Sequence, residues 1–161
     1  MRVKIAIVLA LTILLLTACA RRDANDQAHS YITQDDAQAL VLRVSQDTKL
    51  RDFKSLQQEF ADDAAINFQQ GDVQNDFTPL GYVNDMDNRY RNIDSYNYFT
   101  EPIRIETIGM AVEVRQTVRI TVTINDAATE TTYANTYLVR TVKGKPKITE
   151  LKVIAFVYRR P

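Results

Sequence analysis

Tyrosine is the residue type that most suggests a binding site in this chain. Four of the eight tyrosines lie close together in the sequence: Tyr82, Tyr90, Tyr96 and Tyr98. Because tyrosine combines a large apolar ring with a polar hydroxyl, such a group suits a pocket or an interface. The alternative is that the rings only close the mouth of the core as packing. The same apolar surface is expected to include Phe68, Phe77 and Phe99.

Carboxylates are the other candidates for chemistry, and each pair has a simpler explanation. Asp62 and Asp63 are adjacent, as an acid and a base can be, but neighbouring aspartates at a helix end more often cap it and turn the chain. Asp85 and Asp87 lie in an acidic region that suggests calcium, yet the glycine and terminal glutamate of an EF-hand loop are absent. A solvated acidic face is therefore the simpler explanation.

Metal and nucleotide sites find no support in the sequence. One cysteine and one histidine are too few for a zinc site, and none of the four glycines clusters into a phosphate-binding loop. We therefore expect no metal and no cofactor.

The only cysteine, Cys19, lies where a lipid can be attached. Residues 1–4 carry two cations and residues 5–16 are apolar except for one threonine, which is typical of a signal peptide. This apolar run is shorter than the about 20 residues that span a bilayer. It leads into the tetrapeptide Leu-Thr-Ala-Cys, which resembles the lipobox that directs diacylglyceryl transfer to the thiol. The alternatives are an ordinary cleaved signal with a free thiol and a buried cysteine.

The predicted organisation is a signal peptide over residues 1–18, a lipidated cysteine and polar tether over residues 19–32, and one domain over residues 33–161. Acyl chains anchor a protein without a spanning helix, at about 0.8 kcal/mol per buried methylene. Ala20 follows the cysteine, whereas an aspartate there resembles the inner-membrane retention signal of enteric bacteria. The periplasmic face of the outer membrane is therefore the expected location.

Charge excludes one class of partner. The chain has 20 basic and 20 acidic side chains, and 45% of its 161 residues are hydrophobic, as in an ordinary globular protein. The basic excess of a nucleic-acid binder is absent. Arg21 and Arg22 lie beside the anchor, where they could meet anionic head groups or belong to a solvated linker.

Helices are expected at the start of the domain. Thr33 begins a sequence that resembles a capping box, and apolar residues then recur at helical spacing to Val44. A second helical pattern covers residues 53–60. Pro79 can open a third helix, which continues to about residue 91.

Strands follow, because the period of the apolar residues changes to two. A short strand is expected over residues 64–68, closed by Gly71 and a polar stretch. Four longer strands are expected over residues 96–108, 111–124, 130–142 and 147–158, with a longer turn over residues 125–129. Short connections make these four antiparallel neighbours, so the fold class is α+β.

This order of elements resembles the nuclear transport factor 2 family, also called SnoaL-like or ketosteroid-isomerase-like. The residues that carry the resemblance are the Phe-Ala-Asp-Asp-Ala segment from Phe60, the helix that begins at Pro79, and the final strand entered through residues 144–148. The resemblance covers roughly residues 33–158. It implies a cone-like curved antiparallel sheet wrapped around N-terminal helices, with a cavity open at one end. The same fold carries many activities.

The isomerase branch of this family has catalytic residues that this chain lacks. The resemblance places its general base at Phe68, its oxyanion-hole tyrosine at Val44, and its acidic second donor near Asn135 or Thr136. Phe68 and Val44 cannot take the roles of the base and the tyrosine, and neither Asn135 nor Thr136 is an acid. The dehydratase-like branch uses a cavity histidine, and the only histidine, His29, lies in the tether. The resemblance therefore implies a domain that is not an enzyme.

Three functional hypotheses follow. The main one is a membrane-anchored periplasmic lipoprotein whose non-catalytic domain binds another protein or supports an envelope assembly. The alternative is a carrier or sensor of a small apolar ligand in the cone cavity, which a cavity filled by side chains would argue against. The third is an enzyme that uses Asp62 or Asp63 together with a tyrosine, and an exposed, unpaired pair of aspartates away from any pocket would argue against it. A homodimer through the sheet's polar outer face is left open.

The candidate ligand or partner surface unites the residues expected around the cavity. It consists of Val44, Phe68, Tyr82, Tyr90, Tyr96, Tyr98 and Tyr137.

Overall fold

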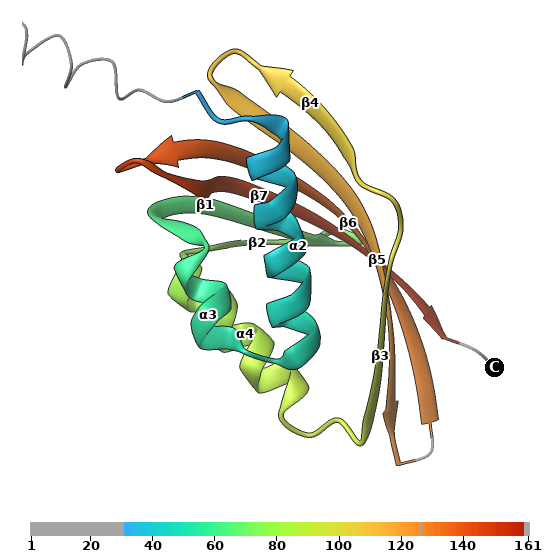
Figure 1. Cartoon of the computed structure of the whole chain (residues 1–161). Coiled ribbons are helices and arrows are strands. Elements are labelled where there is room, and N and C mark those ends of the chain that lie inside the picture. The colour runs from blue at the N-terminus through green and yellow to red at the C-terminus, as the bar shows by residue number, and fades with distance from the viewer. Residues whose placement is uncertain (1–30, 126, 160–161) are drawn as a thin grey trace, which may run out of the picture. The chain divides into compact units, whose positions relative to one another are not determined.

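A strongly curved sheet with three helices against its concave side makes up the domain (Figure 1). The computed structural model describes residues 31–125 and 127–159. The expected signal peptide, Cys19 and His29 lie outside the described residues. No helix among the described residues has the length and apolar character needed to cross a membrane.

The helices begin where their capping residues predict. Helix α2 spans Gln34–Leu50, and the hydroxyl of Thr33 accepts the backbone N–H of Asp36 at 3.1 Å. Helix α3 spans Phe53–Gln58 and helix α4 spans Pro79–Tyr90. The first and third expected helices are therefore confirmed. The second is shorter than expected, because Phe60 is the first residue of a strand.

Seven strands form one sheet. They are β1 (Phe60–Gln70), β2 (Val73–Phe77), β3 (Ser95–Thr100), β4 (Arg104–Ile108), β5 (Ala111–Ile124), β6 (Ala127–Val142) and β7 (Lys145–Arg159). Their order in the sheet is β2-β1-β7-β6-β5-β3, and β4 also pairs with β5. The α+β class and the curved sheet are confirmed. The sheet is mixed, however, because β1 runs parallel to β7.

Local differences from the expected strands have local causes. The polar stretch after Gly71 forms β2, whose largely exposed side chains show no alternation. The strand expected over residues 96–108 is divided into β3 and β4, because Pro102 lies between them and has no N–H to donate to a ladder. Ile124 pairs with Ala127, so the turn expected over residues 125–129 is shorter.

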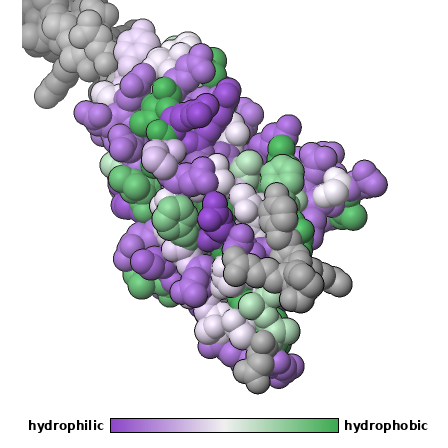
Figure 2. Space-filling model, turned by 90° about the vertical axis from the view of Figure 1, so that its right-hand side faces the viewer, coloured by the Kyte–Doolittle hydropathy of each residue, from purple (hydrophilic) through white to green (hydrophobic). Residues whose placement is uncertain are grey.

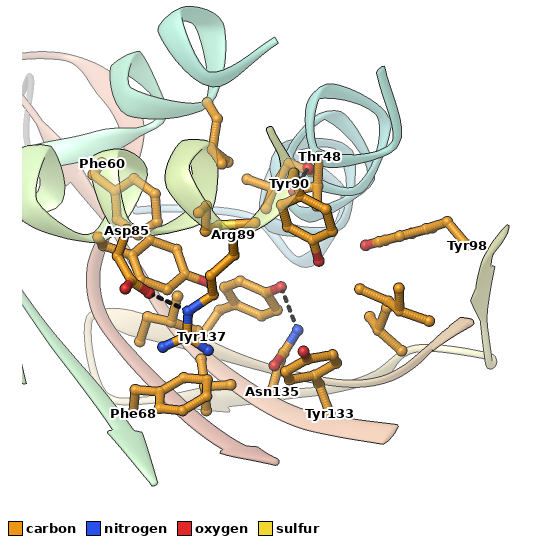
Figure 3. A pocket seen from close by; sticks show the side chains of 18 residues that line it. Thr48, Phe60, Phe68, Asp85, Arg89, Tyr90, Tyr98, Tyr133, Asn135 and Tyr137 are labelled. Carbon is orange, nitrogen blue, oxygen red and sulfur yellow. Dashed lines mark hydrogen bonds and ion pairs between the residues drawn. The ribbon is translucent and has the colours of Figure 1, made fainter. Parts of the chain in front are cut away.

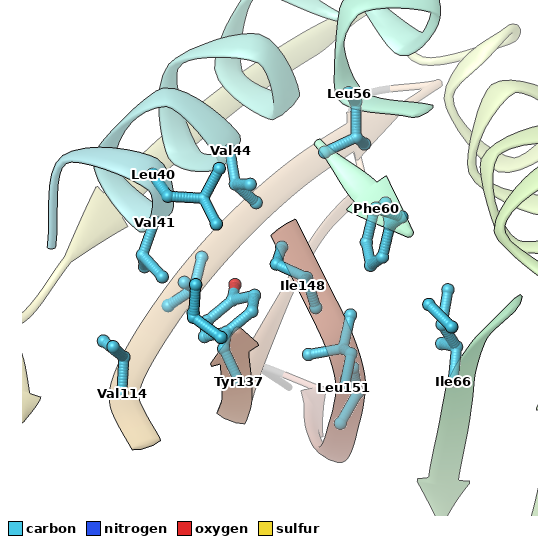
Figure 4. Close-up of a cluster of buried hydrophobic side chains, with 14 of the residues drawn as sticks. Leu40, Val41, Val44, Leu56, Phe60, Ile66, Val114, Tyr137, Ile148 and Leu151 are labelled. Atoms are coloured by element: carbon cyan, nitrogen blue, oxygen red, sulfur yellow. The ribbon is translucent and has the colours of Figure 1, made fainter. Parts of the chain in front are cut away.

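The core lies between α2 and the concave face of the sheet (Figure 4). Leu40, Val41 and Val44 recur at helical spacing on α2 and are at most 5% exposed. They pack with residues from several strands, among them Val114 on β5 and Ile148 on β7. This packing fixes α2 across the sheet and leaves the residues at its C-terminal end to border a pocket.

The outer face of the sheet is mainly polar. On the face shown in Figure 2, hydrophilic side chains predominate and hydrophobic ones lie scattered among them. On β5, Arg119 Nη2 lies 3.5 Å from Glu101 Oε1. Its guanidinium carbon lies 5.8 Å from the centroid of the Phe99 ring. Dimerisation through this face stays a prediction.

Candidate functional site

A pocket lies between α4, the C-terminal half of α2 and the concave face of the sheet (Figure 3). Its volume is about 50 Å³. A buried water needs about 10–15 Å³, so this space admits a few water-sized groups. Pockets for drug-sized ligands hold about 300–1,000 Å³. The cavity is therefore small, although side chains do not fill it completely.

Most of the residues expected at the cavity lie around this one pocket. The lining includes Val44 from α2, Phe68 from β1, Tyr82 and Tyr90 from α4, Tyr98 from β3 and Tyr137 from β6. Helical spacing places Tyr82 and Tyr90 on the same side of α4, since they are eight residues apart. These residues come from two helices and three strands that are distant in sequence, and they meet at a single site.

Three of the aromatic residues expected at this surface, Phe77, Tyr96 and Phe99, do not line the pocket. The ring of Tyr96 packs edge-on against that of Tyr90, which lines the pocket, with the two centroids 5.2 Å apart. The rings of Phe77 and Tyr82 pack edge-on, with their centroids 6.1 Å apart. Phe99 is 59% exposed, so the expectation that it extends the pocket surface is wrong. Side chains alternate along β3, so Tyr98 faces inward and Phe99 faces outward.

Sequence reasoning did not assign five polar residues to this site, which are Thr48, Asp85, Arg89, Tyr133 and Asn135. Asp85 and Arg89 are spaced for one face of α4, and β6 places Tyr133, Asn135 and Tyr137 on one face by alternation. Both patterns were present in the sequence. Asp85 drew attention only as a calcium ligand, and β6 contains no contrast between apolar and charged residues.

An ion pair borders the mouth of the pocket. Asp85 Oδ2 lies 2.7 Å from Arg89 Nε, and the two side chains are 32% and 43% exposed. The guanidinium of Arg89 also lies over the ring of Phe68, 4.9 Å from its centroid. These contacts hold Arg89 across the opening between α4 and β1.

A polar pair lies on the wall formed by β6. Asn135 Nδ2 donates to the hydroxyl of Tyr137 at 3.0 Å. Asn135 Oδ1 is buried and has no hydrogen-bond partner in the described part of the chain. If the positions of Oδ1 and Nδ2 are exchanged, Oδ1 accepts from the hydroxyl of Tyr137 and the NH2 group is left without a partner, because Tyr137 reaches only one of the two. Either way, one polar group of Asn135, a residue of the pocket wall, lacks a partner among the described residues.

The phenols of the pocket are uncharged hydrogen-bonding groups. Burial raises the pKa of Tyr98 to about 12. Burial likewise raises the pKa values of Tyr82, Tyr90, Tyr133 and Tyr137 above the usual value for tyrosine. At neutral pH each of these side chains keeps its proton and can donate one hydrogen bond.

The carboxylates expected as an alternative catalytic pair lie elsewhere. The side chain of Asp62 is 99% exposed and lies 3.7 Å from Lys143 Nζ. Neither Asp62 nor Asp63 lines the pocket described above, which we call the tyrosine-lined pocket. The described residues contain no group of three or more side chains of the kinds that hold a metal ion.

Known structures resemble this domain closely in their backbone. A hexachlorocyclohexane dehydrochlorinase (LinA type 2) has a TM-score of 0.66 and 13% identity, over 79% of this chain and 88% of its own. A proposed scytalone dehydratase from Novosphingobium aromaticivorans has a TM-score of 0.65 and 11% identity, over 79% and 87%. An NTF2-like protein from Cytophaga hutchinsonii has a TM-score of 0.62 and 14% identity, over 78% and 100%. The domain has the NTF2-like fold.

No protein-family model and no curated protein sequence matches the chain. The NTF2-like resemblance expected from the sequence is thus confirmed through the fold. The expectation that the domain is not an enzyme is overturned, because its structural neighbours include proteins named as enzymes. That expectation rested on the residues of particular branches, and the fold carries catalysis in other forms.

Proposed function

We propose that the NTF2-like domain binds a small, mainly apolar molecule with a hydrogen-bonding group in the tyrosine-lined pocket. We further propose that a lipid on Cys19 holds the domain at the outer membrane, on its periplasmic side. The pocket carries the first part of this proposal, and the signal-like segment and the Leu-Thr-Ala-Cys tetrapeptide support the second.

The unpaired end of the Asn135 amide is the observation that carries the binding proposal. A buried polar atom without a partner costs about 1–3 kcal/mol, so a fold keeps one where another group can satisfy it. The rest of the lining is mainly apolar or phenolic, and its other polar members are Thr48, Asp85 and Arg89. A ligand with one complementary polar group and an apolar body would match both parts of this wall.

Arg89 controls how large that ligand can be. With Arg89 in place the cavity is about 50 Å³, which excludes a ring-sized molecule. The Arg89–Asp85 pair is half-exposed, and pairs of this kind contribute only about 0–1 kcal/mol. Turning Arg89 outward therefore costs little and opens the pocket toward α4 and β1.

Native mass spectrometry of the protein purified from its own host tests the proposal. We expect a small mass retained at stoichiometric level by the wild type and lost in Asn135→Leu. The matched control is Asn97→Leu, which makes the same change at an exposed position of β3. Thermal melting followed by circular dichroism would establish that both variants fold. A bare wild-type domain, or a bound protein of the envelope with an empty pocket, would favour the assembly role instead.

A second candidate function is an elimination reaction, and the position of Asp85 favours it. Asp85 is the only carboxylate among the residues that line the pocket. Once released by Arg89, it could take a proton from carbon. The electron pair of that C–H bond would form a C=C bond as a halide or hydroxide leaves the neighbouring carbon. The protonated phenol of Tyr133 could donate a hydrogen bond to the leaving group.

Chloride release from hexachlorocyclohexane, the compound that names one structural neighbour, tests this candidate. We expect Asp85→Asn to lower the rate by about 10²–10⁴-fold, as removal of a general base does. Asp87→Asn is the matched control, because Asp87, two residues after Asp85, forms an exposed pair of the same spacing with Arg91 and does not line the pocket. Equal rates in the two variants, or no chloride release by the wild type, would contradict dehydrochlorination.

A further inference from the structure

A second hollow in the domain is lined by lysines. It lies between α3, the start of β1 and the β6–β7 hairpin, and has a volume of about 740 Å³. Four of the seven lysines of the chain border it: Lys54, Lys143, Lys145 and Lys147. Asp62 is the only acidic residue among the lining residues. The hollow therefore carries a net charge of +3, although the whole chain has a net charge of zero.

The backbone holds these lysines at one end of the sheet. Val142 pairs with Lys145, so Lys143 and Gly144 form a two-residue turn. Both have positive φ angles, of 52° and 76°, as a type I′ turn requires. Lys145 and Lys147 then lie two residues apart on β7 and project from the same face. A tight hairpin thus fixes the spacing of the Cα atoms of three lysines.

Little of this charge is neutralised within the domain. Lys147 donates to the backbone carbonyl of Gln58, which uses one of its three N–H donors. Lys143 lies 3.7 Å from Asp62, but the two side chains are 86% and 99% exposed, so water screens the pair. Most of the N–H donors in the hollow therefore remain available to a ligand.

We propose that this lysine-lined hollow binds an anion that carries two or more phosphate groups. Clustered ammonium groups attract such an anion and donate several charge-assisted hydrogen bonds to its oxygens. The volume of the hollow lies in the range of ligand sites, and the side chain of its single carboxylate, Asp62, is 99% exposed. The same phosphate chemistry occurs in free polyphosphates and in the head groups of anionic lipids.

Binding of inorganic tripolyphosphate by the full-length protein, measured by titration calorimetry, tests the proposal. The double variant Lys143→Gln/Lys145→Gln is expected to bind tripolyphosphate with an affinity at least about tenfold lower, because charge-assisted hydrogen bonds are lost. The matched control Lys49→Gln/Lys152→Gln removes the same charge at exposed positions elsewhere and is expected to keep wild-type affinity. No binding by the wild type, or equal weakening in both double variants, would overturn the proposal.

A second arm separates the two sources of phosphate. Chemical acylation of the Lys143 amine is measured by mass spectrometry with vesicles of phosphatidylcholine alone and with vesicles that also contain an anionic lipid with two phosphate groups. If the vesicles with anionic lipid slow the acylation of Lys143 and the phosphatidylcholine vesicles do not, the ligand is a lipid head group. Binding of tripolyphosphate without such protection would identify a free polyphosphate. The calorimetric arm does not depend on lipidation of Cys19 or on the tyrosine-lined pocket, so each proposal can fail separately.

Discussion

Raising the pH above about 10 is expected to unfold the domain, and the buried tyrosines are the cause. Burial raises the pKa of Tyr98 from its usual value of 10.0 to about 12. The pKa values of five further tyrosines are raised as well: Tyr82, Tyr90, Tyr96, Tyr133 and Tyr137. Five of these six phenols line the pocket, and the sixth, Tyr96, packs against Tyr90.

The sign of the effect follows from the number of bound protons. Above about pH 10 the unfolded chain loses phenolic protons that the folded domain retains, so stability falls as the pH rises. Below that pH both states are protonated and the contribution is complete. For Tyr98 the shift corresponds to about 3 kcal/mol, lost as the pH rises through the pKa of about 12. Domains are typically stable by about 5–15 kcal/mol, so several such residues suffice.

Phenolate absorbance and far-ultraviolet circular dichroism, followed together during an alkaline titration, check this prediction. We expect the buried tyrosines to ionise in the same transition in which the secondary structure is lost. Tyr98→Phe should make the transition less steep. The matched control Tyr31→Phe removes a phenol that is 76% exposed and should leave the transition unchanged. Ionisation of these tyrosines with the circular dichroism intact would show that the pocket admits water and hydroxide.

The sequence predicted the helices and the inward-facing tyrosines because these depend on local rules. Thr33 and Pro79 mark helix starts through backbone groups within one turn. Tyr98 and Tyr137 lie on strands whose alternation determines which face each side chain takes. Six of the seven residues expected at the cavity therefore line one pocket.

The features that sequence reasoning missed depend on contacts between distant segments. The parallel pairing of β1 with β7 joins Phe68 to Val153, and no local pattern specifies it. Edge strand β2 is polar because its side chains need not be buried. The importance of Asn135 lies in the absence of a partner for one end of its amide, which only the folded arrangement reveals. The lysine-lined hollow likewise combines α3 with a hairpin about 90 residues later.

Loss of the cysteine thiol is expected to release the protein from the membrane. Cys19→Ser removes the atom that would accept the diacylglyceryl group. Each acyl methylene buried in the bilayer contributes about 0.8 kcal/mol, so two or three chains dominate the attachment. Arg21→Gln/Arg22→Gln is the control, because two basic residues near anionic lipid contribute only about 1 kcal/mol each. This double variant should stay in the membrane fraction.

Mass spectrometry of the N-terminal peptide decides between lipidation and its alternatives. In the wild type we expect the mature chain to begin at Cys19 and to carry the mass of a diacylglyceryl group. A free thiol at position 19, or a mature chain that begins elsewhere, would contradict lipidation, even if fractionation finds the protein with the membrane. A lipidated N-terminus would place the domain at the end of a tether of about a dozen residues. The tyrosine-lined pocket and the lysine-lined hollow would then both work close to a membrane surface, where apolar molecules and phosphate groups are concentrated.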